Sequence, residues 1–186
     1  MAWQRLLALP LALYVLWLSF AYEYHFLDGV NLAFHEAGHL FLSFGGQTLH
    51  VLGGTLGQLF FPAACAFHFL RRGERFEASV MGIWGAESLM NVAAYLGDAE
   101  AQALPLVGGH IHDWHWLLSR AGMLPACQEI AWALHAAASL AAIACLVAGA
   151  REVPASHTRS EVRSATARST SAATASGRRP ASTRTM

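Results

Sequence analysis

Long apolar runs alternate with short polar breaks along the first 150 residues of the chain. Five runs are long enough for helices: residues 5–22, 30–44, 58–70, 77–98 and 125–150. Such runs are typical of helices that cross a bilayer, because in lipid each backbone polar group must be satisfied within its own segment. The pattern predicts an all-α integral membrane protein, with a bundle of about five transmembrane helices.

The first run, residues 5–22, has two interpretations. Arg5 and the stretch Ser19-Phe20-Ala21 loosely fit the basic start and the cleavage site of a signal peptide. However, the apolar run is longer than usual for a signal peptide, and the aromatic residues at its end resemble an interfacial anchor. We therefore favour a retained transmembrane helix.

A glycine-rich segment, "GGQTLHVLGGTLG", follows the second run at residues 45–57. Five of its thirteen residues are glycine. So much glycine beside an apolar helix indicates irregular or extended backbone, which is tolerated at membrane depth where it is buried in protein or lines a wet cavity. The sequence predicts a glycine-rich loop here, with a simple surface loop as the alternative.

Composition strengthens the membrane interpretation and separates the tail from the rest. The chain is 55% hydrophobic and only 13% charged, whereas soluble domains carry about 25% charged residues. Residues 151–186 are rich in Arg, Ser, Thr and Ala, and have too few large apolar residues to build a core. We expect a membrane-embedded domain over residues 1–150 and a disordered tail over 151–186. The tail would either be solvated without a dedicated role or contact anionic lipid head groups through its arginines.

Basic residues also predict an orientation. Arg71, Arg72 and Arg75 lie between the third and fourth runs, and short basic loops face the cytoplasm. Five crossings then place the N-terminus outside and the tail in the cytoplasm. We expect the protein in a bacterial inner membrane, with the lipid bilayer and no nucleic acid among its partners.

The second run contains "HEAGH", residues 35–39, in apolar surroundings. On a helix, His35 and His39 lie on one face and can bind one ion, while Glu36 is offset by about 100° and can reach a water beside that ion. A charged group in a membrane helix costs about 2.5–3.5 kcal/mol on insertion scales, so these residues need compensation. One Zn2+ would provide it. The alternative is hydrogen bonding to neighbouring helices.

A third ligand must come from elsewhere in the chain. The pair His112 and Asp113, in "GGHIHDWHWLL", is the first choice, because the glycines let this loop fold back; His110 and His115 lie in the same loop. Glu87 ranks second as an intramembrane acid, and Asp98, at the outer end of the fourth run, ranks third.

The remaining histidines and the cysteines carry less information. We expect hydrogen bonds between helices or at the membrane interface for the isolated histidines, His25, His50, His68 and His135. The three cysteines lack CxxC spacing and are expected to be small buried apolar residues.

The membrane-embedded "HEAGH", the "GGTLGQ" that enters another helix and the later helix with Asn91 and acidic residues resemble the site-2 protease family of intramembrane zinc metalloproteases. The resemblance covers roughly residues 30–113. In that family an aspartate in an Asn…Pro…Leu-Asp-Gly segment is the third zinc ligand. No Leu-Asp-Gly follows Asn91 here, so this ligand cannot be carried over.

These observations predict a membrane zinc metalloprotease. Glu36 would be the general base, and the segment with Gly53 and Gly54, together with Asn91, would bind an extended part of a membrane-associated protein substrate. Two alternatives remain at this point: a non-catalytic membrane protein with a metal or structural site, and a zinc hydrolase that acts on a lipid amide.

Overall fold

The computed structural model describes residues 2–107 and 111–153. Of the tail predicted to be disordered, Arg151 and Glu152 instead belong to the last helix, and residues 154–186 lie outside the described residues, as does His110. The described residues form helices and no strand, as the sequence predicts. The helices are α1 (Ala2–Phe20), α2 (Phe26–Leu42), η1 (Ser43–Gly45), α3 (Gly46–Arg71), α4 (Arg75–Gly97), α5 (Asp113–Ala121), η2 (Leu124–Ala126) and α6 (Cys127–Glu152).

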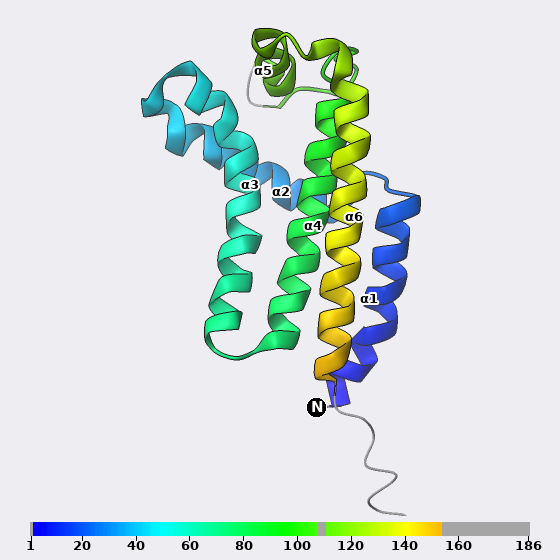
Figure 1. Ribbon diagram of the computed structural model, residues 1–186. Coiled ribbons are helices and arrows are strands. Elements are labelled where there is room, and N and C mark those ends of the chain that lie inside the picture. The colour runs from blue at the N-terminus through cyan, green and yellow to red at the C-terminus, as the bar shows by residue number, and fades with distance from the viewer. Residues whose placement is uncertain (1, 108–110, 154–186) are drawn as a thin grey trace, which may run out of the picture. The chain divides into compact units, whose positions relative to one another are not determined.

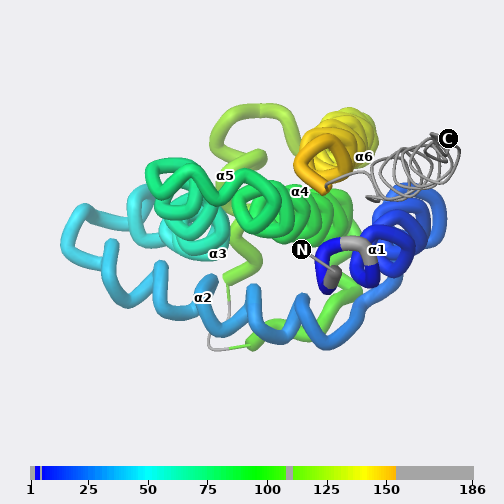
Figure 2. Tube along the Cα trace, turned by 90° about the horizontal axis from the view of Figure 1, so that it is seen from below, coloured from blue at the N-terminus to red at the C-terminus, as the bar shows by residue number. Residues whose placement is uncertain are grey.

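Four of the long helices, α1, α3, α4 and α6, run alongside one another (Figure 1). Figure 2 views them nearly end on and shows α2 running across this direction. The sequence predicted α2 as one of five similar crossings, whereas its buried side chains are mostly polar: Asp28, Asn31 and His35. Helix α2 packs most extensively on α3.

The transverse course of α2 corrects the expected topology. Trp3, at the start of α1, stacks edge-on against Phe76 with 5.4 Å between ring centroids. Arg75, at the start of α4, pairs with Glu152 at the end of α6 at 3.6 Å. The start of α1 therefore lies at the same end of the bundle as the α3–α4 turn and the end of α6 (Figure 1). The sequence placed it at the opposite end, because it counted α2 as a full crossing.

Two helical stretches of the described residues, Phe26–Arg71 and Leu124–Glu152, are long and apolar enough to cross a membrane. The first comprises α2, η1 and α3. Helix α1 contains a shorter apolar stretch, Leu6–Phe20. Large apolar side chains point outward from these helices, including Leu6 and Phe60, which are 76% and 65% exposed.

The glycine-rich segment is helical, contrary to expectation. After η1, the chain turns at Gly46, whose φ is +80°, and continues as the first turns of α3. A Cβ added to Gly53 would lie 2.5 Å from the carbonyl oxygen of Gly38, and one on Gly57 would lie 2.5 Å from that of Phe34. The glycines thus bring the backbones of α2 and α3 into contact, a role of small residues in closely packed helices.

Two apolar clusters hold the other helices together. Leu18 of α1, Met90 of α4 and Ala138 of α6 are fully buried in the first cluster. In the second, Leu118 of α5 packs with residues of α4 and α6, among them Leu96. The second cluster fixes α5 over the end of the bundle, with its first turn near α2.

Candidate metal centre

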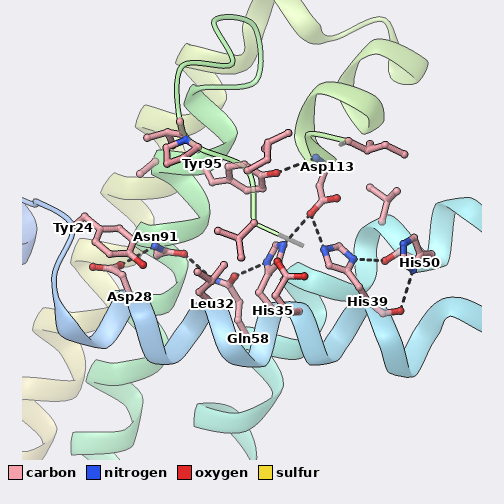
Figure 3. A pocket seen from close by; sticks show the side chains of 18 of the residues that line it. Tyr24, Asp28, Leu32, His35, His39, His50, Gln58, Asn91, Tyr95 and Asp113 are labelled. Carbon is pink, nitrogen blue, oxygen red and sulfur yellow. Dashed lines mark hydrogen bonds and ion pairs between the residues drawn. The ribbon is translucent and has the colours of Figure 1, made fainter. Parts of the chain in front are cut away.

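His35 and His39 lie one turn apart on α2 and face the start of α5. Nε2 of His35 is 2.9 Å from Oδ2 of Asp113, and Nε2 of His39 is 3.1 Å from the same oxygen. Figure 3 shows the three side chains converging from α2 and α5. His35 and Asp113 are buried, and His39 is partly buried. The structure thus brings together the two histidines of "HEAGH" and the first-choice third residue.

Local structure explains how Asp113 reaches this position. His112 caps α5, since its Nδ1 accepts a hydrogen bond from the backbone N–H of His115 at 3.2 Å. The backbone N–H of Asp113 donates to the hydroxyl of Tyr95 on α4 at 3.2 Å. Together with the packing of Leu118, these contacts point the first residue of α5 toward α2.

Gln58 on α3 determines which nitrogen of His35 carries a proton. Its side-chain amide donates to the backbone carbonyl of Ser88 at 3.1 Å, and a carbonyl can only accept. The amide oxygen therefore faces Nδ1 of His35, at 2.9 Å, and Nδ1 must donate. In the neutral imidazole, Nε2 is then unprotonated and turns its lone pair toward Asp113.

The same arrangement holds for His39. Its Nδ1 lies 2.7 Å from the backbone carbonyl oxygen of His50, which again can only accept a hydrogen bond. His50 returns the contact, since its own Nδ1 lies 3.0 Å from the carbonyl oxygen of His39. Nε2 of neutral His39 therefore also presents a lone pair to Asp113.

Three atoms with lone pairs thus meet, and no proton of a neutral imidazole lies between them. Burial on its own would raise the pKa of Asp113, whereas the hydrogen bonds that protonated His35 and His39 would donate to it hold the pKa below its usual range. Atoms bound to one tetrahedral Zn2+ at about 2.0–2.2 Å lie roughly 3.3–3.6 Å apart. The separations of 2.9 Å and 3.1 Å are a few tenths of an ångström shorter, so the residues can hold a zinc ion after a small outward shift of Asp113.

A cavity of about 630 Å³ opens beside this group. Glu36 lines it together with the three clustered residues, so its carboxylate can reach a molecule that enters. Most of the wall is apolar or aromatic: Tyr22, Tyr24, Leu32, Val51, Ala94, Tyr95, Leu104, Pro105, Leu106, Val107 and Ile111.

The other candidates for the third ligand, including His112 of the first-choice pair, lie elsewhere. Glu87 is fully buried and accepts a hydrogen bond from Asn31 at 2.9 Å. Asp98 ends α4, where it accepts the backbone N–H groups of Ala103 and Leu104 at 2.9 and 3.0 Å. His112 turns Nε2 toward Asp98 at 3.5 Å. Among the described residues, none of these three joins the group of His35, His39 and Asp113.

The structure places the residues predicted to bind substrate in two different settings. Gly53 and Gly54 are buried in the contact between α2 and α3. A Cβ on Gly54 would lie 2.4 Å from Nε2 of His35, so this glycine makes room for the ring. Asn91 does line the cavity; it accepts from Gln58 at 3.2 Å and donates to Asp28 at 2.8 Å.

Sequence reasoning missed the residues that orient the histidines. Gln58 is 3% exposed, and a buried amide within an apolar run was a signal that could have singled it out. Three of the isolated histidines do bond to another helix: His50 contacts α2, Nε2 of His135 lies 3.2 Å from the carbonyl oxygen of Ser19, and Nε2 of His25 lies 2.7 Å from the hydroxyl of Tyr14.

No protein-family model, curated protein or solved structure matches the chain.

Proposed function

We propose that this protein is an integral membrane zinc hydrolase, and that its substrates are peptide bonds of membrane-associated proteins. The observation that carries the proposal is the convergence of three lone-pair donors, from His35, His39 and Asp113, at the wall of a cavity that Glu36 also lines. Three protein ligands with an open side are typical of catalytic zinc, whereas structural zinc has four.

The membrane part of the proposal rests on the outward-facing apolar side chains. We propose that α1, α3, α4 and α6 cross the bilayer and that α2 lies across them within the protein. Four crossings replace the five expected from the sequence. The turn with Arg71, Arg72 and Arg75 then faces the cytoplasm by its positive charge, together with the start of α1 and the end of α6.

Each residue has a distinct task in the proposed reaction. His35, His39 and Asp113 would hold Zn2+, whose Lewis acidity makes water acidic enough to react near neutral pH and polarises a carbonyl. Glu36 would accept a proton from the attacking water and deliver it to the leaving amine. Gln58 and the carbonyl of His50 would keep both imidazoles in the tautomer that binds metal.

Peptide bonds would not reach this centre by pairing with the glycine-rich segment, as the sequence predicted. The glycine-rich segment is part of α3, so it offers no strand edge along which an extended substrate could pair. A substrate would instead enter the cavity, whose wall includes Leu32, Val51 and Leu106. This apolar wall also suits an acyl chain, and we retain a lipid amide as the second candidate substrate.

Glu36→Gln is the decisive variant. We expect it to retain as much zinc as the wild type, because Glu36 is not a ligand, and to lose hydrolysis. The purified proteins would be reconstituted in vesicles with a labelled transmembrane peptide or with an N-acyl amide lipid, and zinc would be measured by elemental analysis. Cleavage of the peptide alone supports proteolysis, and cleavage of the lipid alone supports the second candidate. Full activity of Glu36→Gln would overturn the mechanism.

A further inference from the structure

A second group of acidic and imidazole side chains lies where α1, α2 and α4 meet. His25 precedes α2, Asp28 lies in its first turn and Glu87 lies in the middle of α4. One possible ligand atom from each lies within 4.8 Å of the other two. Asp28 and Glu87 are both 0% exposed.

The surroundings contain little positive charge. Among the described residues, the only ion-pair partner of either carboxylate is His25. Two buried carboxylates beside one imidazole call for a compensating positive charge, because burying an unpaired charge is costly.

Asp28 is firmly oriented within the group. Its Oδ2 accepts the backbone N–H of His25 at 2.8 Å and also faces the ring nitrogen Nδ1 of that residue. Its Oδ1 accepts from Asn91 at 2.8 Å and from the hydroxyl of Tyr22. Asp28 therefore holds the His25 ring with Nε2 directed away from it, toward Tyr14 of α1 and, farther away, Glu87 of α4.

Glu87 provides a second, independent indication that an ion binds here. Its Oε2 accepts a hydrogen bond from Asn31 at 2.9 Å, whereas its buried Oε1 has no hydrogen-bond partner. This oxygen faces Nε2 of His25 at 3.9 Å. That separation is too long for a hydrogen bond, and it is a few tenths of an ångström longer than the roughly 3.3–3.6 Å between two atoms bound to one tetrahedral zinc ion. A small movement of either side chain would therefore let both atoms bind one ion.

We propose that His25, Asp28 and Glu87 form a second buried site for a divalent cation of the zinc class. Nε2 of His25 and Oε1 of Glu87 would bind the ion, while Asp28 would orient and polarise His25, as carboxylates do behind metal-bound histidines. The hydroxyl of Tyr14 lies 2.7 Å from Nε2 of His25. When an ion binds, this hydroxyl would either become a further ligand or move away from Nε2.

The proposal does not depend on the proposed function. Figure 3 shows Asp28, Asn91 and Gln58 leading from one group toward His35 in the other. The two groups are thus neighbours in one polar network but have no residue in common. Variants of one group can therefore be used to count the metal in the other.

The test counts zinc after equilibrium dialysis of the purified full-length protein in detergent against Zn2+. The starting chain is His35→Ala/His39→Ala, which lacks the first group. Glu87→Gln or His25→Asn is then added to it. Glu129→Gln is the matched control, since Glu129 is exposed. Glutamine at position 87 keeps an oxygen for Asn31, and circular dichroism checks that each variant remains helical.

We expect one zinc per chain in His35→Ala/His39→Ala, one after Glu129→Gln is added, and almost none after Glu87→Gln or His25→Asn. A helical His35→Ala/His39→Ala chain without zinc overturns the second site and shows that a proton supplies the missing charge. Zinc that survives both Glu87→Gln and His25→Asn also overturns it. By contrast, equal zinc in the wild type and His35→Ala/His39→Ala would count against the first centre and the proposed function.

Discussion

Nε2 of His35 lies 2.9 Å from Oδ2 of Asp113, although the two residues are 78 positions apart in the chain. Neither atom can donate a proton to the other while His35 is neutral, because the proton of His35 lies on Nδ1, which donates to the amide oxygen of Gln58. Either a protonated imidazole or the cation proposed above accounts for this contact. It also joins α5 to α2, so the proposed centre links two of the segments that border the cavity.

Asp113 should be essential for zinc at this centre, and Asp98 should not. We expect Asp113→Asn to weaken zinc binding by more than the roughly 10- to 100-fold loss typical of outer-shell partners. Asp98→Asn should leave zinc affinity nearly unchanged, since Asp98 bonds to the backbone at the end of α4. Competition with a zinc-binding dye measures both affinities. Weaker binding by Asp98→Asn than by Asp113→Asn would reverse the assignment.

Gln58 should raise the zinc affinity of the centre by orienting His35, although it does not bind the ion itself. Gln58→Leu removes the acceptor for Nδ1 of His35, so the ring can rotate or change tautomer. We expect zinc affinity to fall by about 10- to 100-fold. Gln128→Leu, at an exposed position on α6, is the control and should have no effect. If the two leucine variants bind zinc equally, the orienting role of Gln58 is wrong.

The close contact between α2 and α3 should tolerate no added methyl group. A Cβ on Gly38 would lie 2.0 Å from the carbonyl oxygen of Gly53, and neither backbone can yield locally. We expect Gly38→Ala to lower the free energy of unfolding by about 1–3 kcal/mol, as measured by denaturant titration in detergent.

Gly29→Ala is the matched control on the same helix. The added Cβ would meet only the Tyr24 hydroxyl, at 4.0 Å. Alanine is favoured over glycine within a helix by about 1 kcal/mol, so this variant should be equally or more stable than the wild type. A similar loss in both variants would show that the packing of α2 on α3 is not the cause.

Removing metal should destabilise the protein through the first centre. A ligand present at 100 times its dissociation constant stabilises the folded state by about 2.7 kcal/mol. We expect a chelator to lower the unfolding temperature of the wild type more than that of His35→Ala/His39→Ala. The difference between the two shifts isolates this centre, and identical shifts would exclude a contribution from it.

Several features followed from the sequence alone because they depend on local spacing. Helices form where apolar runs are continuous, and histidines four positions apart share a face wherever the chain is helical. For that reason "HEAGH" pointed to the pair His35 and His39 before any tertiary information. The candidate Asp113 came from composition and loop glycines, which narrowed the choice without deciding it.

Tertiary packing decided the rest. The glycines at 53, 54 and 57 predicted a loop, because glycine weakens an isolated helix. In the structure they are helical, because only residues without a side chain leave room for α2 to pack this closely against α3. The same contact turns α2 across the bundle, which changes the side on which α1 begins. The partners of His35, Gln58 and Asp113, come from α3 and α5. No local pattern encodes such encounters, because they depend on how distant helices pack together.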